Sequence, residues 1–491
     1  MKHLHIFAAL LPLFVLASCS KTSSPAPEMV FRTFGAQMNQ PVNPDRQDGR
    51  AILSSTSVVW QEGDRIAIVP KGKTTIYPFT LASGAGTTSA TFAGECPDGA
   101  DDTYYAFYPY HPDSLKLYSG TVTGAVYGGS VSSQKITSFS AAFSHVQHAV
   151  ENNIDPYLNF CFAESNNGTF AMQNLLSLLK FQVSDSDVNM VVFNSTESKK
   201  YLAGGRLVSR FIAHSDGEPF FQCLGSTGRK ECVVVLPPQG ETTFSTGKTY
   251  YAAVVSKMGG YSSAGQPQYD YKTRAILYKN GYYSYKSSSS KLTLDRNTIY
   301  DCGTLDPAGS GWTGWKALTT NNVTASFASK TYNKTVSGAT VTATADFPTE
   351  SNTTTIAPYF KIGGSAWAKI TISQSGSAFR WDEANTSLFC NCGGGTRTGF
   401  EVSPLMYKPI SRLVFTFVKV EGDSATPEVR LCEGITSSSA AYGSGICDLS
   451  GLEAGATKDL ALDLDPYSIG CNFICNVIGK AHIRSIAIRY N

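Results

Sequence analysis

The chain has 491 residues, the length of about three ordinary domains. Its 40 lysine and arginine residues nearly balance its 38 acidic residues, so the formal net charge is only +2. No basic stripe stands out along the chain, and we expect no nucleic-acid partner. Only 16% of the residues are charged, whereas glycine, serine, threonine and tyrosine are abundant. This composition is typical of β-rich extracytoplasmic proteins.

The first nineteen residues resemble a secretory signal of the lipoprotein type. Lys2 gives a positive start, residues 6–17 are uncharged and mostly apolar, and Leu16–Cys19 (Leu-Ala-Ser-Cys) fits a lipoprotein processing site. The apolar run is too short to span a bilayer well. We therefore expect the mature protein to begin at Cys19 and to be held on a membrane by lipid on that cysteine. The alternative is an ordinary secretory signal in which Cys19 stands by chance.

The next segments predict a tether, a strand and a loop. Residues 20–28 are rich in serine and proline, as flexible tethers are. A short strand is expected over residues 29–34, and a polar, exposed loop over residues 39–49. Helical periodicity is scarce in the body of the chain, with a turn or two expected over residues 143–150.

Short alternating segments fill the body of the chain. Apolar and polar residues alternate between clusters of Gly, Asn, Ser and Pro, which is the pattern of antiparallel sheets. Examples are residues 58–69, 103–110, 178–183, 232–236 and 250–255. The predicted fold is all-β, with tandem antiparallel β-sandwiches.

The composition changes after residue 306. Residues 307–314 are rich in glycine and are predicted to be a linker. Residues 315–491 are predicted to form one further β-sandwich of jelly-roll type. Its expected strands include residues 366–373, 412–420, 428–432 and 482–490.

The cysteines and histidines do not predict a metal site. If Cys19 carries lipid, eleven of the 12 cysteines remain, so they cannot all pair internally. The spacings of Cys390-Asn391-Cys392 and of Cys471 with Cys475 match no common zinc pattern. We expect disulfides or buried thiols here. His145 and His148 have no evident third ligand and are predicted to be a surface pair.

Several spaced segments between residues 29 and 306 resemble the fimbrillins, the type V pilins of Gram-negative anaerobic bacteria. Trp60–Ile68 (WQEGDRIAI) is similar to the family's W-x-x-G-D-x-I strand entry, and Tyr104–Pro109 (YYAFYP) resembles its aromatic-Pro strand. The other segments, in the family's order, are the strand 29–34, the loop ending in Arg50-Ala51, residues 175–181 with 201–204, residues 233–239 and residues 294–305. The resemblance implies two β-sandwich domains, residues 29–165 and 166–306, in a lipoprotein of the outer membrane.

The resemblance also implies an assembly mechanism. In fimbrillins a trypsin-like protease cuts after an arginine in the loop behind the first strand, and that strand leaves with its lipid. A strand from another subunit then fills the opened groove, so the implied partners are other fimbrillin-like subunits that bind by donor-strand exchange. Here Arg50 is the first candidate for cleavage and Arg46 the second, because both lie in polar loop sequence. The alternative is that neither is cut and the protein stays anchored.

The C-terminal extension departs from a plain stalk subunit. It predicts an accessory, tip or anchor subunit, or a surface adhesin, with the extension as a head that binds a glycan or another host surface ligand. Exposed aromatic faces stack on sugar rings, which makes Trp312, Trp315, Trp367 and Trp381 candidate binding residues. The alternative is that each of these tryptophans is core. Residues 482–490 either close the C-terminal sandwich or are donated to another subunit.

Two further functions stay open. One is a surface glycan-binding lipoprotein that never polymerises. The other is a glycan-active enzyme, for which Asp382-Glu383 and Asp463-Leu464-Asp465 supply neighbouring carboxylates. Carboxylates in loops are usually solvated, and the chain has no G-x-S-x-G, H-E-x-x-H or phosphate-loop motif. We therefore expect no catalytic residue, no cofactor and no enzyme activity.

Overall fold

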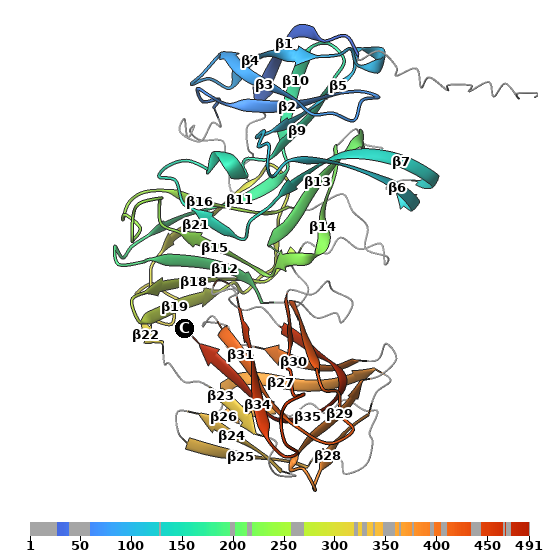
Figure 1. Ribbon diagram of the computed structural model, residues 1–491. Helices are drawn as coiled ribbons and strands as arrows, with labels where there is room; N and C mark the ends of the chain where they lie inside the picture. The colour runs from blue at the N-terminus through green and yellow to red at the C-terminus, as the bar shows by residue number, and fades with distance from the viewer. Residues whose placement is uncertain are drawn as a thin grey trace, which may run out of the picture.

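The computed structural model describes most of residues 59–318 and the core strands of the C-terminal part. The described ranges are 27–38, 59–126, 129–196, 202–213, 219–256, 270–318, 323–326, 331–336, 339–346, 359–362, 365–375, 378–392, 397–403, 410–433, 443–464, 467 and 473–490. These ranges contain strands and two 3-10 turns, η1 (Ala100–Asp102) and η2 (Pro156–Leu158), but no α-helix. The predicted all-β class is confirmed. Figure 1 shows the strands in three units that follow one another along the length of the molecule.

The first unit is a closed barrel with the strand order β1-β10-β9-β5-β2-β3-β4. Its strands are β1 (Val30–Met38), β2 (Arg65–Pro70), β3 (Tyr77–Ser83), β4 (Ser89–Cys96), β5 (Tyr104–Tyr108), β9 (Cys161–Ser165) and β10 (Thr169–Asn174). The interior is aromatic, with Trp60, Phe79, Phe92 and Phe170 fully buried. Closure leaves the barrel without a free edge strand.

The second unit combines a six-stranded, a three-stranded and a four-stranded sheet, with the orders β22-β19-β18-β12-β15-β8, β16-β11-β21 and β14-β13-β7-β6. The six-stranded sheet comprises β8 (Val146–His148), β12 (Met190–Ser195), β15 (Cys232–Leu236), β18 (Thr273–Lys279), β19 (Tyr282–Ser287) and β22 (Lys316–Ala317). The others comprise β6 (Lys116–Val126), β7 (Gly129–Ala142), β11 (Leu176–Val183), β13 (Ala203–Ala213), β14 (Pro219–Lys230), β16 (Tyr250–Val255) and β21 (Ile299–Leu305). A small ladder pairs β17 (Asp270–Tyr271) with β20 (Leu292–Thr293).

Strands that are apolar on both faces join the units. In β5, Tyr104 and Ala106 point into the barrel core, whereas Tyr105 and Phe107 belong to the core of the second unit. The six-stranded sheet repeats this arrangement, because Val191 of β12 faces the core of the second unit and Val192 faces the C-terminal core. Alternate side chains of one strand point to opposite faces. Continuous apolar packing on both faces of β5 and β12 therefore joins the three units.

The C-terminal unit is a sandwich built around one long strand, β35 (Phe473–Tyr490). Its other strands are β23 (Val323–Ser326), β24 (Thr331–Val336), β25 (Ala339–Asp346), β26 (Tyr359–Ile362), β27 (Ser365–Ser375), β28 (Ala378–Asp382), β29 (Ser387–Cys392), β30 (Arg397–Ser403), β31 (Ile410–Val418), β32 (Glu428–Glu433), β33 (Gly443–Ile446) and β34 (Thr457–Asp463). The first half of β35 pairs with β30 and β32, and the second half pairs with β23, β29 and β31. The change of sheet falls at Gly479, whose φ of +98° suits glycine.

Two sequence expectations are resolved in these regions. Residues 482–490 lie inside the C-terminal sandwich, with Ile486 and Ile488 fully buried, so the strand closes this unit. Residues 143–150 do not form the expected helical turns. They contain β8, which pairs in parallel with β15. The side chain of Gln147 bonds to the backbone of Ala253 in β16, accepting at 2.8 Å and donating at 2.7 Å.

Two further expectations concern the histidines of this segment and the cysteines. His145 is buried and His148 is exposed, so the expected surface pair is wrong for His145. The buried cysteines of the described ranges include Cys96, Cys161, Cys232 and Cys447. Burial raises the pKa of Cys96 to about 11, which keeps this thiol protonated and unreactive.

Candidate functional site

The N-terminal strand β1 completes the barrel. It pairs antiparallel with β4 from Val30 opposite Cys96 to Gln37 opposite Ser89, and parallel with β10 from Gly35 opposite Thr169 to Met38 opposite Met172. These ladders involve backbone groups on both sides of β1. If β1 left, β4 and β10 would each become an edge with unpaired backbone donors and acceptors. We call the space that β1 occupies between β4 and β10 the β1 seat.

Alternate side chains of β1 fill the barrel. Phe34 is 3% exposed, and Ala36 and Met38 are also buried. The Phe34 ring lies within an aromatic cage, with centroid distances of 5.3 Å to Phe79, 4.9 Å to Tyr104 and 5.3 Å to Phe170. Burial of a side chain of this size contributes about 1.5–3 kcal/mol. Side-chain packing therefore holds β1 in its seat, in addition to the backbone ladders.

The opposite face of β1 is open to solvent. Phe31 is 67% exposed, and Met29, just before the strand, is 46% exposed. On the inward face, Arg32 precedes Phe34; it forms an ion pair with Asp98, and its guanidinium carbon lies 5.5 Å from the centroid of the Tyr104 ring. The exposed apolar residues at the start of β1 contrast with the buried residues of its second half. The strand is thus anchored more firmly at its C-terminal end.

Trp60 reaches into the β1 seat. Its indole Nε1 donates a hydrogen bond to the backbone carbonyl of Ala36 at 3.2 Å. The indole is fully buried and packs edge-on against Phe92 and Tyr108, with centroid distances of 4.8 and 5.1 Å. Backbone bonds with Thr87 and Gly86 fix the position of residue 60. The indole therefore presents a fixed donor to the strand in the seat.

A tight turn places Trp60 next to β2. The carboxylate of Asp64 accepts hydrogen bonds from the backbone N–H of Gln61 at 2.7 Å and from the Tyr108 hydroxyl at 3.0 Å. Gly63 has a φ of +85°, which suits glycine at this turn. Burial raises the pKa of Asp64 and outweighs the opposing effect of its two hydrogen bonds. The W-x-x-G-D segment is thus a structural motif that positions Trp60 and links the turn to β5.

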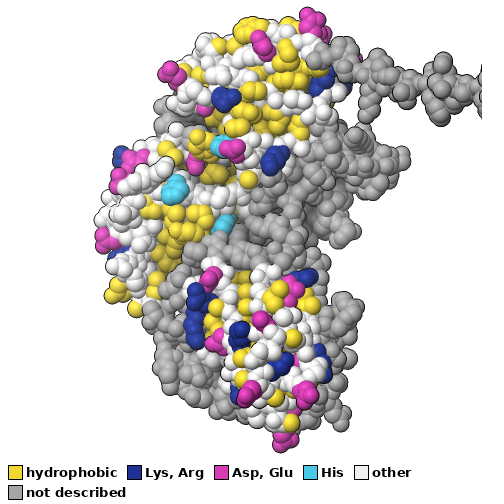
Figure 2. Space-filling model, viewed as in Figure 1, with side chains coloured by type: hydrophobic (Ala, Val, Ile, Leu, Met, Phe, Trp, Pro, Cys, Tyr) yellow, Lys and Arg dark blue, Asp and Glu magenta, His cyan; other side chains and the backbone are white. Residues whose placement is uncertain are grey.

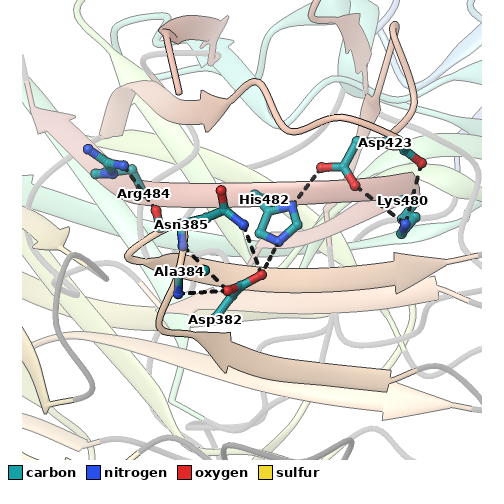
Figure 3. A network of polar contacts seen from close by, with 8 residues as sticks. Asp382, Ala384, Asn385, Asp423, Lys480, His482 and Arg484 are labelled. Atoms are coloured by element: carbon teal, nitrogen blue, oxygen red, sulfur yellow. Dashed lines mark hydrogen bonds and ion pairs between the residues drawn. The ribbon is translucent and has the colours of Figure 1, made fainter. Parts of the chain in front are cut away.

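A second polar cluster lies in the C-terminal unit, around His482 (Figure 3). His482 Nδ1 lies 2.6 Å from Asp423 Oδ2, and His482 Nε2 lies 2.9 Å from Asp382 Oδ2. The side chains are 4%, 1% and 14% exposed for His482, Asp423 and Asp382. The imidazole ring of His482 therefore bridges the two carboxylates, with one ring nitrogen within hydrogen-bond distance of each.

Residues around this cluster fix each carboxylate. Asp382 accepts from the backbone N–H of Ala384 at 3.0 Å and from the side-chain amide of Asn385 at 3.1 Å. Lys480 Nζ lies 3.9 Å from Asp423 Oδ1, and Arg484 donates to the Asn385 carbonyl at 3.1 Å. The cluster joins the turn after β28, the loop after β31 and β35. It ties these three segments to one another.

The cluster gives a definite acid dependence. Burial opposes ionisation of Asp382, but hydrogen bonds from Asn385 and His482 outweigh it and lower the pKa of Asp382 below its usual 3.8. Ionised Asp382 therefore stabilises the fold at pH values above 3.8. This contribution is lost as the pH falls through the lower pKa that Asp382 has in the folded protein. We expect Asp382→Asn to reduce the loss of unfolding free energy on acidification, as measured by denaturant titration from neutral pH downward. The exposed Asp113→Asn variant is the control, and the prediction fails if both variants follow the wild-type curve.

The tryptophans proposed as a ligand surface fall into two groups. Trp312 and Trp315 are half-buried and pack against the core of the second unit. The Lys279 ammonium lies 4.3 Å from the Trp315 ring centroid and 2.8 Å from Asp185. Trp367 stands on β27 and Trp381 on β28, and their side chains lie outside the described residues. Trp312 and Trp315 thus lie beside the second unit, whereas the other two stand on strands of the C-terminal unit.

The residues proposed for lipidation and cleavage lie outside the described ranges. These are Cys19, Arg46 and Arg50. The described chain ends at Met38 and resumes at Val59, so both arginines lie in the sequence that connects β1 to Trp60.

The described residues contain no group of three or more His, Cys, Asp or Glu side chains that could hold a metal ion. Within the same ranges, no helix has both the length and the apolar character needed to cross a membrane. On the face shown in Figure 2, basic and acidic side chains are interspersed over the units.

Comparisons with known proteins give little further information. No family model matches the chain, and no curated protein matches it. Among solved structures, the chain is similar to a proposed cell adhesion protein from Bacteroides uniformis, with 14% sequence identity and a TM-score of 0.27. The match covers 52% of this chain and 92% of that protein. A likeness at this level does not constrain the fold or the function of the chain.

Proposed function

We propose that the chain is a fimbrillin-like surface lipoprotein, a structural or adhesive subunit of a pilus-like fibre. Lipid on Cys19 attaches it to the outer membrane. Cleavage after Arg50, or after Arg46, releases β1 with the lipid. A strand from another fimbrillin-like subunit then enters the β1 seat by β-strand addition.

The observation that carries this proposal is the position of β1. It is the first strand of the described residues, it closes the barrel between β4 and β10, and it precedes the segment that contains both arginines. Loss of β1 would create two sheet edges and an empty aromatic cage in the same place. Such a groove can be satisfied by an extended strand of another chain.

The C-terminal unit fits the position of a head, accessory or anchor domain in this proposal. It packs on the second unit through an apolar core in which Val234 and Ile276 meet Leu413 and Phe415. The two units therefore offer one continuous body, as a load-bearing surface protein requires. Of the tryptophans proposed for glycan binding, Trp312 and Trp315 are half-buried and so offer only part of their rings to a sugar.

Replacing both arginines by alanine tests the proposed processing. We expect Arg46→Ala with Arg50→Ala to abolish the shortened chain and the fibres in surface extracts, because no arginine remains between Met38 and Val59. The readouts are immunoblotting of chain length and electron microscopy of sheared surface material.

The matched control is Lys73→Ala, which removes a basic residue of the barrel surface outside this segment. It should leave chain length and fibres unchanged. Fibres at the wild-type level in the double arginine variant would contradict the proposal.

A further inference from the structure

The inward side chains of β1 follow a definite pattern. The inward positions of β1 are aromatic, small and long apolar, at Phe34, Ala36 and Met38. Phe34 fills the cage of Phe79, Tyr104 and Phe170, and Met38 Sδ lies 3.9 Å from Cys161 Sγ. These two pockets are unlike in shape and chemistry. A strand shifted by two residues would place a wrong side chain in each.

The small middle position coincides with the hydrogen bond from Trp60. The indole nitrogen is 3.2 Å from the carbonyl of Ala36, and the ring is fully buried beside that residue. Protein interiors are close-packed, so a larger side chain at this position would compete with the indole for space. The indole N–H is buried away from water. A bound strand that placed no carbonyl within its reach would leave this donor unsatisfied, which is costly.

The backbone directions add a second constraint. The strand must run antiparallel to β4 over Val30–Gln37 and parallel to β10 over Gly35–Met38. The Trp60 contact lies within the short stretch where both ladders are present. A strand shifted by two residues would also offer a carbonyl here, so the selection comes from the indole ring, which leaves room only for a small residue at the position that accepts its hydrogen bond.

We propose that Trp60 is the residue that sets the register of the strand in the β1 seat, and that the seat accepts an incoming strand of another subunit with an aromatic, a small and a long apolar residue at alternate inward positions. The carbonyl of the small residue accepts the hydrogen bond from Trp60. This inference rests on the proposed strand exchange. Trp60 acts here as a positioning residue for the partner strand.

The test uses the full chain with a protease recognition sequence placed between residues 39 and 58, cut after folding so that β1 stays bound by contacts alone. Fluorescent peptides of residues 28–40 then compete for the seat. We expect the wild-type peptide to bind, and a peptide with Ala36→Phe to bind at least tenfold more weakly. We expect Trp60→Phe, which keeps an aromatic ring but removes the donor, to weaken the wild-type peptide by about tenfold.

A register readout separates this role from simple packing. Thr33 faces Ala93 in the ladder, so a cysteine at position 93 should form a disulfide with a peptide cysteine at position 33 and not with one at position 31 or 35. In Trp60→Phe, we expect cross-links from position 31 or 35 to appear. Equal affinity and unchanged register in Trp60→Phe would overturn the inference.

A second measurement leaves the protein unchanged, in case Trp60→Phe does not fold. A peptide with an ester in place of the amide between Ala36 and Gln37 carries a weaker acceptor at the carbonyl that Trp60 contacts. It should bind more weakly than a control peptide with an ester between Thr33 and Phe34, and equal binding would overturn the inference. Peptide exchange without dependence on Trp60 would leave the proposed function standing. Absence of peptide exchange in the nicked protein would count against strand exchange itself.

Discussion

Replacing Phe34 by alanine is expected to lower the free energy of unfolding of the barrel by about 3–5 kcal/mol. Phe34 is 3% exposed and contacts three aromatic rings, so its removal deletes buried apolar area and leaves a cavity between Phe79, Tyr104 and Phe170. Because these contacts hold β1, we also expect faster hydrogen exchange in β1 and in β4, its ladder partner. Denaturant titration with hydrogen-exchange mass spectrometry measures both effects.

The matched control for Phe34 lies three residues earlier on the same strand. Phe31 is 67% exposed, so Phe31→Ala should change the unfolding free energy by no more than about 0.5 kcal/mol. A similar, small effect of both substitutions would mean that β1 is not held in the barrel by its inward face.

Replacing His482 by alanine is expected to destabilise the C-terminal unit by about 3–5 kcal/mol. The substitution leaves Asp382 and Asp423 buried near one another without the imidazole that lies between them and contacts both. The loss should appear as a lower denaturant midpoint for the C-terminal strands, followed by hydrogen exchange in β28, β31 and β35. The barrel should keep its wild-type exchange rates.

A double variant tests whether the effect comes from the ion cluster. His482→Ala with Asp423→Ala removes one unbalanced carboxylate, so it should cost less than the sum of the two single substitutions. His148→Ala, an exposed histidine whose ring contacts the Pro237 carbonyl at 3.2 Å, is the control and should cost about 1 kcal/mol or less. Additive effects of His482 and Asp423 would contradict the cluster.

The all-β fold could be predicted because alternation and turn residues are local signals. The way the units join was harder to predict. Continuous apolar runs such as Tyr104–Tyr108 and Cys232–Leu236 are buried on both faces, since each strand lies between two cores. A continuous run does not identify its two partners, because those partners are distant in sequence. Residues 143–150 carry a weak helical signal, but they contain β8, which pairs with β15. The local sequence does not encode this contact.

The candidate site shows the same division. The W-x-x-G-D segment could be found from the sequence, because its turn chemistry is contained in Gln61–Asp64. The contact from Trp60 to Ala36 could not, because the two residues are 24 positions apart and belong to separate segments. The cluster of Asp382, Asp423 and His482 was missed for the same reason, and Asp382 was expected to be solvated in a loop. Asp382 lies 100 positions and Asp423 lies 59 positions before His482 in the sequence.

The N-terminal sequence of the native protein in surface extracts tests the central claim most directly. We expect high-molecular-weight, fibre-containing fractions to carry a chain that begins at Ala51, or at Gln47 if Arg46 is cut, and that lacks the β1 sequence. A single, monomeric species whose N-terminus is blocked by lipid at Cys19 would contradict it.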